Sequence, residues 1–356
     1  MRACMTAAAA DLACSRQNAF PNAEIDVLAA ADWLFPGGMD HHRLMTSSRL
    51  GNDLFVKLVR RMGGSGTLPD QPPSSLPPIT AREVDVCIVG AGPAGLAAAA
   101  AIVAARPRMR ILLVDDQLHP GGSLLALPGG TAQGAKRAAD LIGAGVDLMR
   151  GAEAIGVYRD AHAGLATLAV STPQGLQKVH ARRFLYATGA YEQGLPFPDA
   201  DHPGVMPFRT TGRLAFGWGV APIPGEGRLF IASPQPKQSG SAATALVEIE
   251  RSLVRGLRER GVDVDIVDAD GALPKANLKR DMIAMVAMPS PASELPRQHG
   301  AEVVYDLERG GFPVTASGDG RCAPDVYVAG DVTGFMGPEA AAAAGARTGA
   351  ALAATL

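Results

Sequence analysis

The sequence predicts an α/β fold with a parallel, doubly wound sheet. Three observations predict it: a strand–helix–strand pattern at 84–115, a second such pattern at 228–269, and two later apolar runs, ending near 187 and 329, that are each followed by glycine. A strand, a helix and a strand in this order form a right-handed parallel unit. Two such units indicate a larger domain and a smaller one.

The first unit begins with VDVCIVG at 84–90, a short apolar run that ends in glycine. The alanine-rich stretch that follows is stopped by Pro107 and is therefore a predicted helix. ILLVD at 111–115 is the second predicted strand. This order within one short stretch is typical of a nucleotide-binding sheet.

The composition restricts the classes of partner. The 356 residues carry a net charge of -2, from 33 basic and 35 acidic residues, and show no basic stripe, which disfavours nucleic acid and anionic membranes. No stretch reaches the ~20 apolar residues of a membrane span. The alanine run at the N-terminus is short and interrupted by Asp11, unlike a signal peptide. We expect a cytoplasmic protein that binds a small molecule or another protein.

Cysteine and histidine spacing gives no metal or dithiol site. The four cysteines are Cys4, Cys14, Cys87 and Cys322. They share no CxxC or ligand spacing, so zinc, an iron–sulfur cluster and a redox dithiol all lack ligands within the chain. The side chains of adjacent His41 and His42 diverge in regular structure, and no further ligands stand near them. We therefore predict no metal site.

The strongest motif is GAGPAG at 90–95, directly between the first strand and its helix. Gly90 permits the tight turn, Gly92 lets a pyrophosphate approach the backbone, and Gly95 lets the helix pack on the strand. Free N–H groups and the helix dipole favour phosphate there. Asp115 closes the second strand, where a carboxylate can bind the adenosine ribose. The sequence predicts an adenine-nucleotide site, for FAD first, with NAD and ATP as alternatives.

Three further segments complete the candidate site: VDDQLHPGGS after the second strand, YATGA after a third, and YVAGDVTG containing a fourth. Asp331 follows a strand and a glycine, where it can bind a ribityl hydroxyl or organise phosphates. Alternatively, it caps the alanine-rich helix expected at 338–353. The predicted cofactor-binding residues are Gly90, Gly92, Pro93, Ala94, Gly95, Asp115, Asp116, Gln117, Gly121, Gly122, Ser123, Thr188, Gly189, Gly330 and Asp331.

The second unit has predicted strands at 228–233 and 262–269 and a predicted helix at 241–260. Its first turn, SPQPKQSGS, holds two prolines and one glycine. Prolines remove backbone donors, and a turn with one glycine does not let a pyrophosphate come close. We expect this domain to have the right topology without binding NAD(P)H in the usual way.

In order, GAGPAG, VDDQLHPGG, ATGAYEQGLPFPDADHPGVM and YVAGDVTG followed by GPEAAAAAGARTGAALA resemble the thioredoxin-reductase-like flavoproteins with two dinucleotide domains. Among these, the chain is most similar to the alpha subunits of heteromeric sarcosine oxidase, dye-linked proline dehydrogenase, opine oxidase and hydrogen cyanide synthase. SRQNAFPNAEIDVLAAADWLFPGGMDHHRLM also looks like the stretch before the dinucleotide domain of sarcosine oxidase alpha subunits. The resemblance covers Arg16 to the C-terminus.

The resemblance implies a Rossmann-type FAD/NAD(P)-binding domain built from two chain segments, with an inserted smaller second dinucleotide-binding-like domain. A connector at 66–80 with five prolines precedes it. The predicted division is 1–65 as a subunit-contact segment, 66–81 as a Pro-rich linker, 82–210 as the first part of the dinucleotide-binding domain, 211–298 as the inserted degenerate NAD-like domain, and 299–356 as the second part.

The resemblance further implies a partner. In such heteromers a D-amino-acid-oxidase-like flavoprotein beta subunit oxidises the C–N bond of an amine or amino acid, and the alpha subunit holds FAD, NAD or ATP and contributes to the electron path. A small iron–sulfur subunit is a further expected partner. The chain lacks the aminomethyltransferase-like tail and a cysteine-rich cluster tail, so folate chemistry and an internal cluster are not expected.

Three functions remain open from the sequence. The first is the alpha subunit of a flavin-dependent amine or amino-acid dehydrogenase or oxidase. The second is a self-sufficient NAD(P)H-dependent flavin reductase of the thioredoxin-reductase type, and the third is a non-redox scaffold that binds NAD or ATP. No side chain of this chain is assigned a catalytic role, because the isoalloxazine performs the redox step in flavin chemistry. The substrate is not encoded in a recognisable pattern.

Overall fold

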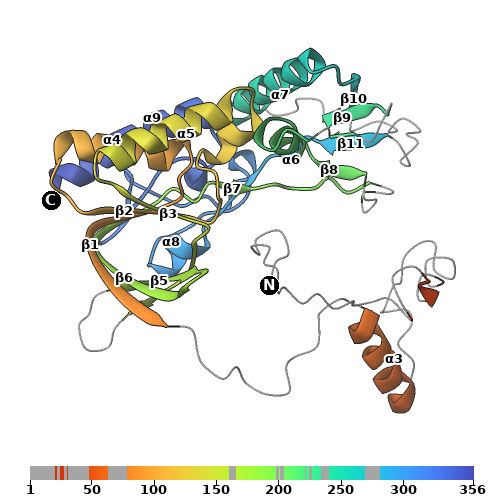
Figure 1. Cartoon of the computed structure of the whole chain (residues 1–356), viewed down its shortest axis with the longest axis horizontal. Helices are drawn as coiled ribbons and strands as arrows, with labels where there is room; N and C mark the ends of the chain where they lie inside the picture. Colours follow the sequence, from red (N-terminus) through yellow and green to blue (C-terminus); the bar gives the residue numbers. More distant parts are fainter. Residues whose placement is uncertain are drawn as a thin grey trace. The chain divides into compact units, whose positions relative to one another are not determined.

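The computed structural model describes residues 21, 25–27, 30, 48–62, 78–159, 166–197, 200, 204–220, 222–223, 227–233, 240–268 and 281–356. The chain divides into two compact units, Met1–Leu76 and Pro77–Leu356. In the first unit, helix α3 (Arg49–Met62) carries exposed Leu50 and Leu54 (Figure 1). All elements that follow belong to the second unit.

The larger sheet of the second unit runs in the order β13-β14-β6-β1-β2-β3, and only β13 and β14 pair antiparallel along it. Its strands are β1 (Ile79–Val89), β2 (Ile111–Asp115), β3 (Asp147–Arg150), β6 (Gly175–Tyr186), β13 (Arg321–Ala323) and β14 (Val326–Val328). Strand β14 comes from the last part of the chain, yet Val328 pairs with Tyr186 of β6. The sheet is therefore built from two separate chain segments, as the resemblance implied.

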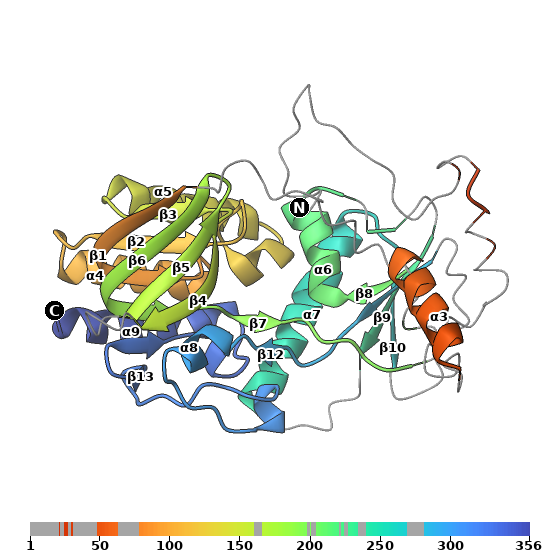
Figure 2. The ribbon, with the colours of Figure 1, turned by 90° about the horizontal axis from the view of Figure 1, so that it is seen from below.

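Both faces of this sheet are buried, which explains the continuous apolar runs in its strands. Val86 and Ile88 pack on one face, whereas Cys87 and Val89 pack on the other. Helices α4 (Pro93–Ala105), α5 (Gly130–Gly143) and α9 (Pro338–Ala354) cover the first face (Figure 1). Strands β4 (Glu153–Arg159) and β5 (Ala166–Thr172) continue antiparallel from β6 and enclose the second core (Figure 2).

Helices α4 and α9 pack backbone against backbone. A Cβ on Gly345 would lie 2.0 Å from the carbonyl oxygen of Ala94, and one on Gly349 would lie 2.4 Å from that of Ala98. Only glycine at these positions permits so close an approach. The contact holds the last helix of the chain beside the glycine-rich turn that opens α4.

The smaller sheet is parallel and has the order β10-β9-β11-β8. Its strands are β8 (Val205–Pro207), β9 (Leu229–Ser233), β10 (Val264–Asp268) and β11 (Met282–Met285), and helix α7 (Ser241–Glu259) packs on it. The predicted strand–helix–strand unit is thus present with nearly the predicted bounds. Its core contains buried Leu229, Ile231, Leu253 and Leu257.

Short elements lie in the connections between these strands and helices. They are β7 (Ala190–Tyr191), β12 (Ser290–Pro291), α6 (Phe208–Gly212), α8 (Glu294–Gln298), a π-helical turn (Arg213–Gly217) and 3-10 turns at Gly122–Ala126, Leu307–Arg309 and Asp331–Thr333. β7 and β12 pair antiparallel and lie side by side (Figure 2). Within the described ranges, no helix has the length and apolar content that crossing a bilayer requires.

Candidate functional site

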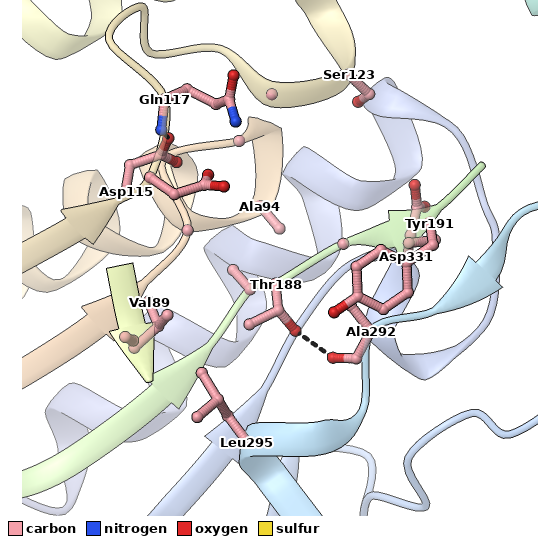
Figure 3. Close-up of a pocket in the computed structure, with 18 of the residues that line it drawn as sticks. Val89, Ala94, Asp115, Gln117, Ser123, Thr188, Tyr191, Ala292, Leu295 and Asp331 are labelled. Atoms are coloured by element: carbon pink, nitrogen blue, oxygen red, sulfur yellow. Dashed lines mark hydrogen bonds between the residues drawn. The ribbon is translucent and has the colours of Figure 1, made fainter. Parts of the chain in front are cut away.

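A cavity of about 630 Å³ opens at the carboxyl ends of the parallel strands of the larger sheet. The ends of β1, β2, β6 and β14 contribute Val89, Asp115, Ala187 and Ala329 to its wall. This edge is where ligands bind in open parallel sheets, because helix N-termini and strand ends converge there. Figure 3 shows Asp115 and Gln117 on one side of Ala94, and Asp331 and Tyr191 on the other.

The glycine-rich turn between β1 and α4 forms the middle of the cavity. Gly90 has a φ of 105°, and a Cβ there would lie 2.3 Å from the carbonyl oxygen of Ala187. A Cβ on Gly95 would lie 1.8 Å from the carbonyl oxygen of Gly90. Gly92, Pro93 and the first turn of α4 face the cavity. The N–H groups of the first turn of α4 have no partner within the helix and can bind an anion, as phosphate binding requires.

The second pair of glycines lies beside the first turn. Gly122 has a φ of 55°, and a Cβ on it would lie 2.8 Å from the Cα of Gly92. Gly122 and Ser123 line the cavity together with Gly92. The loop after β2 therefore lies beside the glycine-rich turn on the same cavity wall.

Asp115 at the end of β2 is 7% exposed, and its carboxylate accepts hydrogen bonds from the N–H groups of Ala91 at 2.5 Å and Gln117 at 2.8 Å. Burial raises the pKa of Asp115 to about 6, and these two hydrogen bonds oppose the increase. Ribose hydroxyls that donate to the carboxylate would stabilise its charged form. Asp116 and Gln117 line the same end of the cavity.

Thr188, Gly189 and Asp331 line the opposite end. The hydroxyl of Thr188 donates to the carbonyl oxygen of Ala292 at 2.6 Å, which joins the end of β6 to the segment after β12 (Figure 3). Asp331 accepts from the N–H of Met336 at 3.0 Å. Burial raises the pKa of Asp331, while the Met336 hydrogen bond and the charge of Arg209 lower it. Asp331 therefore faces the cavity and also contacts the loop just before α9.

Three predicted residues, Gly95, Gly121 and Gly330, do not line the cavity. They hold backbones together around it. Gly121 donates to the carbonyl oxygen of Ala91 at 2.9 Å, and a Cβ on Gly330 would lie 2.7 Å from the Cβ of Ala94. The other twelve predicted residues line one cavity.

Sequence reasoning missed two arginines of the cavity wall. Arg209 on α6 and Arg213 in the next turn both face the cavity. Arg209 is 5% exposed, forms an ion pair with Glu192, and its guanidinium carbon lies 5.5 Å from the centre of the Phe335 ring. Burial lowers the pKa of Arg213, as does the neighbouring Arg209. The spacing FRTTGR at 208–213 places two cations on one helix face, a pattern that a solvated helix also shows.

The mouth of the cavity is acidic. Tyr191 donates a hydrogen bond to Glu294 at 3.2 Å, and Glu153 lines the cavity nearby. Partial burial raises the pKa of Tyr191, and the charge of Glu294 raises it further. These groups are outside the predicted set, although Tyr191 and Glu192 lie inside the ATGAYEQG motif.

The smaller sheet has a buried carboxylate near the end of β9. Ser233 at the end of β9 donates a hydrogen bond of 2.8 Å to the buried carboxylate of Glu250 on α7. The turn at 234–239 lies outside the described residues, as do His41 and His42. The carboxylate of Glu250 would oppose an anion near the end of β9 through like charge.

The fold and the cavity define a protein of the α/β class with two Rossmann-type domains and a cavity at the strand ends of the larger one. Residues 84–219 match the family described as pyridine nucleotide-disulphide oxidoreductase. This match covers the glycine-rich turn and the whole first segment of the site.

The predicted resemblance to sarcosine oxidase alpha subunits is confirmed. The chain is 30% identical to sarcosine oxidase subunit alpha of Rhizobium meliloti (strain 1021) over 227 residues, which are 58% of this chain and 23% of that one. It is 34% identical to the same subunit of Corynebacterium sp. (strain P-1) over 140 residues, 34% of this chain and 14% of that one. The matches therefore span less than a quarter of the length of these relatives.

Solved structures share the fold. L-proline dehydrogenase from P. horikoshii superposes with a TM-score of 0.60 at 21% identity, over 76% of this chain and 55% of that chain. Thioredoxin reductase from T. acidophilum superposes with a TM-score of 0.54 at 17% identity, over 77% of this chain and 99% of that chain. The predicted thioredoxin-reductase-like architecture is confirmed.

Proposed function

We propose that this chain is the alpha subunit of a heteromeric flavin-dependent amine or amino-acid dehydrogenase or oxidase, and that FAD occupies the cavity beside α4. A partner beta subunit of the D-amino-acid-oxidase type oxidises the C–N bond, and a small iron–sulfur subunit completes the complex. The observation that carries the proposal is a cavity with the glycine-rich turn in its middle and a separate end on each side. The similarity to sarcosine oxidase alpha subunits supports the assignment to C–N oxidation.

Two features favour FAD over the alternatives. The cavity runs from Asp115, past the glycine-rich turn, to Asp331. It therefore has room for the second half of a dinucleotide, which ATP does not possess. Its far end contains Arg209, whose positive charge opposes the cationic ring of oxidised NAD. A flavin is neutral when oxidised and meets no such repulsion.

The residues fit a role in holding the cofactor. Free N–H groups at the start of α4 would bind the pyrophosphate, and Asp115 would bind the adenosine ribose. Asp331 and Thr188 would bind the flavin half of the dinucleotide. The cofactor supplies the redox chemistry, and the protein supplies binding and orientation. Burial raises the pKa of Cys87 to about 12 and that of Cys322 to about 11, so neither forms a thiolate readily. Disulfide chemistry at these two cysteines is therefore not part of the proposal.

The test is to purify the tagged full chain with the subunits that accompany it, separate the chains after denaturation, and identify each released nucleotide by absorbance and mass. We expect FAD with this chain and a second flavoprotein among its partners. Asp115→Asn should release most of the nucleotide, and Asp147→Asn, an exposed carboxylate outside the cavity wall, is the matched control. ATP or NAD in place of FAD would instead favour the scaffold function.

A stand-alone flavin reductase is the second candidate. Anaerobic NADPH would bleach the flavin of such an enzyme without any partner. Amines or amino acids should bleach the flavin of the proposed complex only when the beta subunit is present. Full-rate amine oxidation by the isolated chain would show that the proposed division of labour is wrong.

A further inference from the structure

A second cavity, of about 250 Å³, lies between helix α9, the end of β14 and the segment 314–318. Gly330 and Thr333 of the turn after β14 belong to its wall, whereas Asp331 of the same turn lines the larger cavity. The turn thus contributes to two cavities. The function proposed above uses only the larger one.

Two arginines line this second cavity. Among the described residues, Arg309 and Arg347 are its charged lining side chains, and no carboxylate lines it. Neither guanidinium forms an ion pair with another described residue. A single exposed arginine is solvated and needs no partner, but two cations at one concave site produce a positive potential that concentrates anions.

An acidic residue close by does not neutralise this charge at the wall. Asp319 follows the lining residues Ser317 and Gly318 in the chain. Its carboxylate accepts hydrogen bonds from the hydroxyl of Ser317 and from the N–H of Arg321, so it is engaged within its own turn. The cavity therefore keeps an excess of positive charge.

Glycines leave room for the polar groups of the wall. Arg309 donates a hydrogen bond to the carbonyl oxygen of Thr333, and a Cβ on Gly334 would lie 2.6 Å from Arg309 Nε. Thr348 on α9 is 5% exposed, and a Cβ on Gly320 would lie 2.4 Å from its Oγ1. The backbone around the cavity thus fits closely around one guanidinium and one hydroxyl.

The hydroxyl of Thr348 has no hydrogen-bond partner within the described ranges. A threonine in a helix often donates to the carbonyl one turn earlier, as Thr211 does to Pro207. Buried hydroxyls normally have a partner. Because Thr348 is buried and lines the cavity, its hydroxyl is available to a ligand there.

The charge and the size of the cavity indicate the class of ligand. Guanidinium groups bind phosphates and carboxylates through paired N–H groups. A phosphate group carries about -1.5 to -2 charges at neutral pH, which matches two cations better than the single charge of a carboxylate. The volume is below the range of about 300–1,000 Å³ that is typical of sites for drug-sized ligands, so the ligand is small.

We propose that Arg309, Arg347 and Thr348 bind a phosphate group in this second cavity, either as inorganic phosphate or as part of a small phosphate monoester. The inference does not depend on which nucleotide occupies the larger cavity.

The test is equilibrium dialysis of the purified complex, with its nucleotide retained, against radiolabelled inorganic phosphate at constant ionic strength. We expect one saturable site per copy of this chain. Arg347→Gln should weaken phosphate binding by about tenfold or more, the loss of a charged hydrogen bond, and Thr348→Val should weaken it several-fold. Arg251→Gln is the matched control, since Arg251 is an exposed arginine on α7 outside both cavity walls.

Arg309→Gln provides an independent measurement if Arg347→Gln does not fold, and it should weaken binding in the same way. Glycerol 3-phosphate serves as a second probe. Binding tighter than that of inorganic phosphate assigns the site to a monoester, and equal or weaker binding assigns it to inorganic phosphate. Phosphate binding that does not saturate, or that is unchanged in Arg347→Gln and Arg309→Gln, overturns the inference and leaves the proposed function intact.

Discussion

The carboxylate of Asp115 accepts a hydrogen bond of 2.5 Å from the backbone N–H of Ala91, which ties the end of β2 to the glycine-rich turn after β1. Burial raises the pKa of this carboxyl from 3.8 to about 6 in the folded protein. A raised folded pKa means that the folded state prefers the protonated form. The free energy of unfolding without ligand should thus fall by about 3 kcal/mol as pH rises from below 4 to above 6.

Nucleotide binding should show the opposite pH dependence. Ribose hydroxyls donate to the charged carboxylate, so binding lowers the pKa of Asp115 and releases a proton near pH 6. We expect FAD affinity to weaken progressively as pH falls from 7 to 5. Asp115→Asn should remove this pH dependence and weaken binding at pH 8 by about tenfold to a hundredfold, the loss of a charged hydrogen bond.

Calorimetric titration of the chain with FAD in buffers of different ionisation enthalpy measures the released proton directly. Asp115→Asn keeps an oxygen that can accept from Ala91, so its turn should remain folded. An equal proton release in wild type and Asp115→Asn would contradict the assignment of this pH dependence to Asp115.

The contact between α4 and α9 should tolerate no added methyl group. In Gly349→Ala the new Cβ would lie 2.4 Å from the carbonyl oxygen of Ala98, and the helices must separate. We expect a loss of about 1–3 kcal/mol in the free energy of unfolding, measured by denaturant titration. Gly143→Ala is the control, because a Cβ at Gly143 meets nothing within 4 Å. Equal stability of the two variants would show that the helices can move apart without cost.

Thr188 should contribute to cofactor affinity through its hydroxyl. Thr188→Val keeps the shape of the side chain but removes the 2.6 Å hydrogen bond to Ala292, which is worth about 0.5–1.5 kcal/mol. The dissociation constant for FAD, measured by flavin fluorescence, should therefore be several-fold higher in this variant. Thr188→Ser retains the donor and should bind nearly as well as wild type. If Thr188→Ser bound FAD as weakly as Thr188→Val, the hydroxyl would not explain the affinity, and the methyl group of Thr188 would be the contributing group.

Reduced nicotinamide nucleotides should not reduce the bound flavin. The sequence after β9 contains two prolines, and the buried carboxylate of Glu250 lies beside Ser233 at the end of that strand. Both features oppose a pyrophosphate at the smaller sheet. Stopped-flow mixing of the anaerobic complex with NADH or NADPH should leave the flavin absorbance unchanged for seconds. Rapid loss of the flavin absorbance would contradict this prediction and favour the flavin-reductase function.

The parallel strand–helix–strand units could be predicted because their signals are local. Strands buried on both faces are continuous apolar runs, and Pro107 marks the end of α4. Strand β1 nevertheless begins at Ile79, earlier than the predicted 84, because its first residues pair with β6. The less apolar pattern at 79–83 carries no clear local sign of that pairing. The predicted domain boundaries remain predictions.

The glycine turn and the carboxylates at strand ends could also be predicted, since each follows a recognisable strand. Arg209, Arg213 and Glu294 could not, because a cavity wall depends on which distant segments converge on it. Nothing in the local pattern of FRTTGR separates a cavity-facing arginine pair from a solvated helix face. Only the pairing of β7 with β12 and the position of α6 bring these residues to the site.

The floor of the cavity depends on β14 and α9, which pair with β6 and α4 from the first segment of the domain. During synthesis the ribosome delivers β1, α4 and β6 long before these partners exist. The glycine-rich turn can form early, but Asp331 and the wall around it arrive only with the last part of the chain. If the proposed cofactor binds in this cavity, its site is complete only after β14 and α9 have been synthesised, and until then the edge of β6 that pairs with β14 stays unpaired.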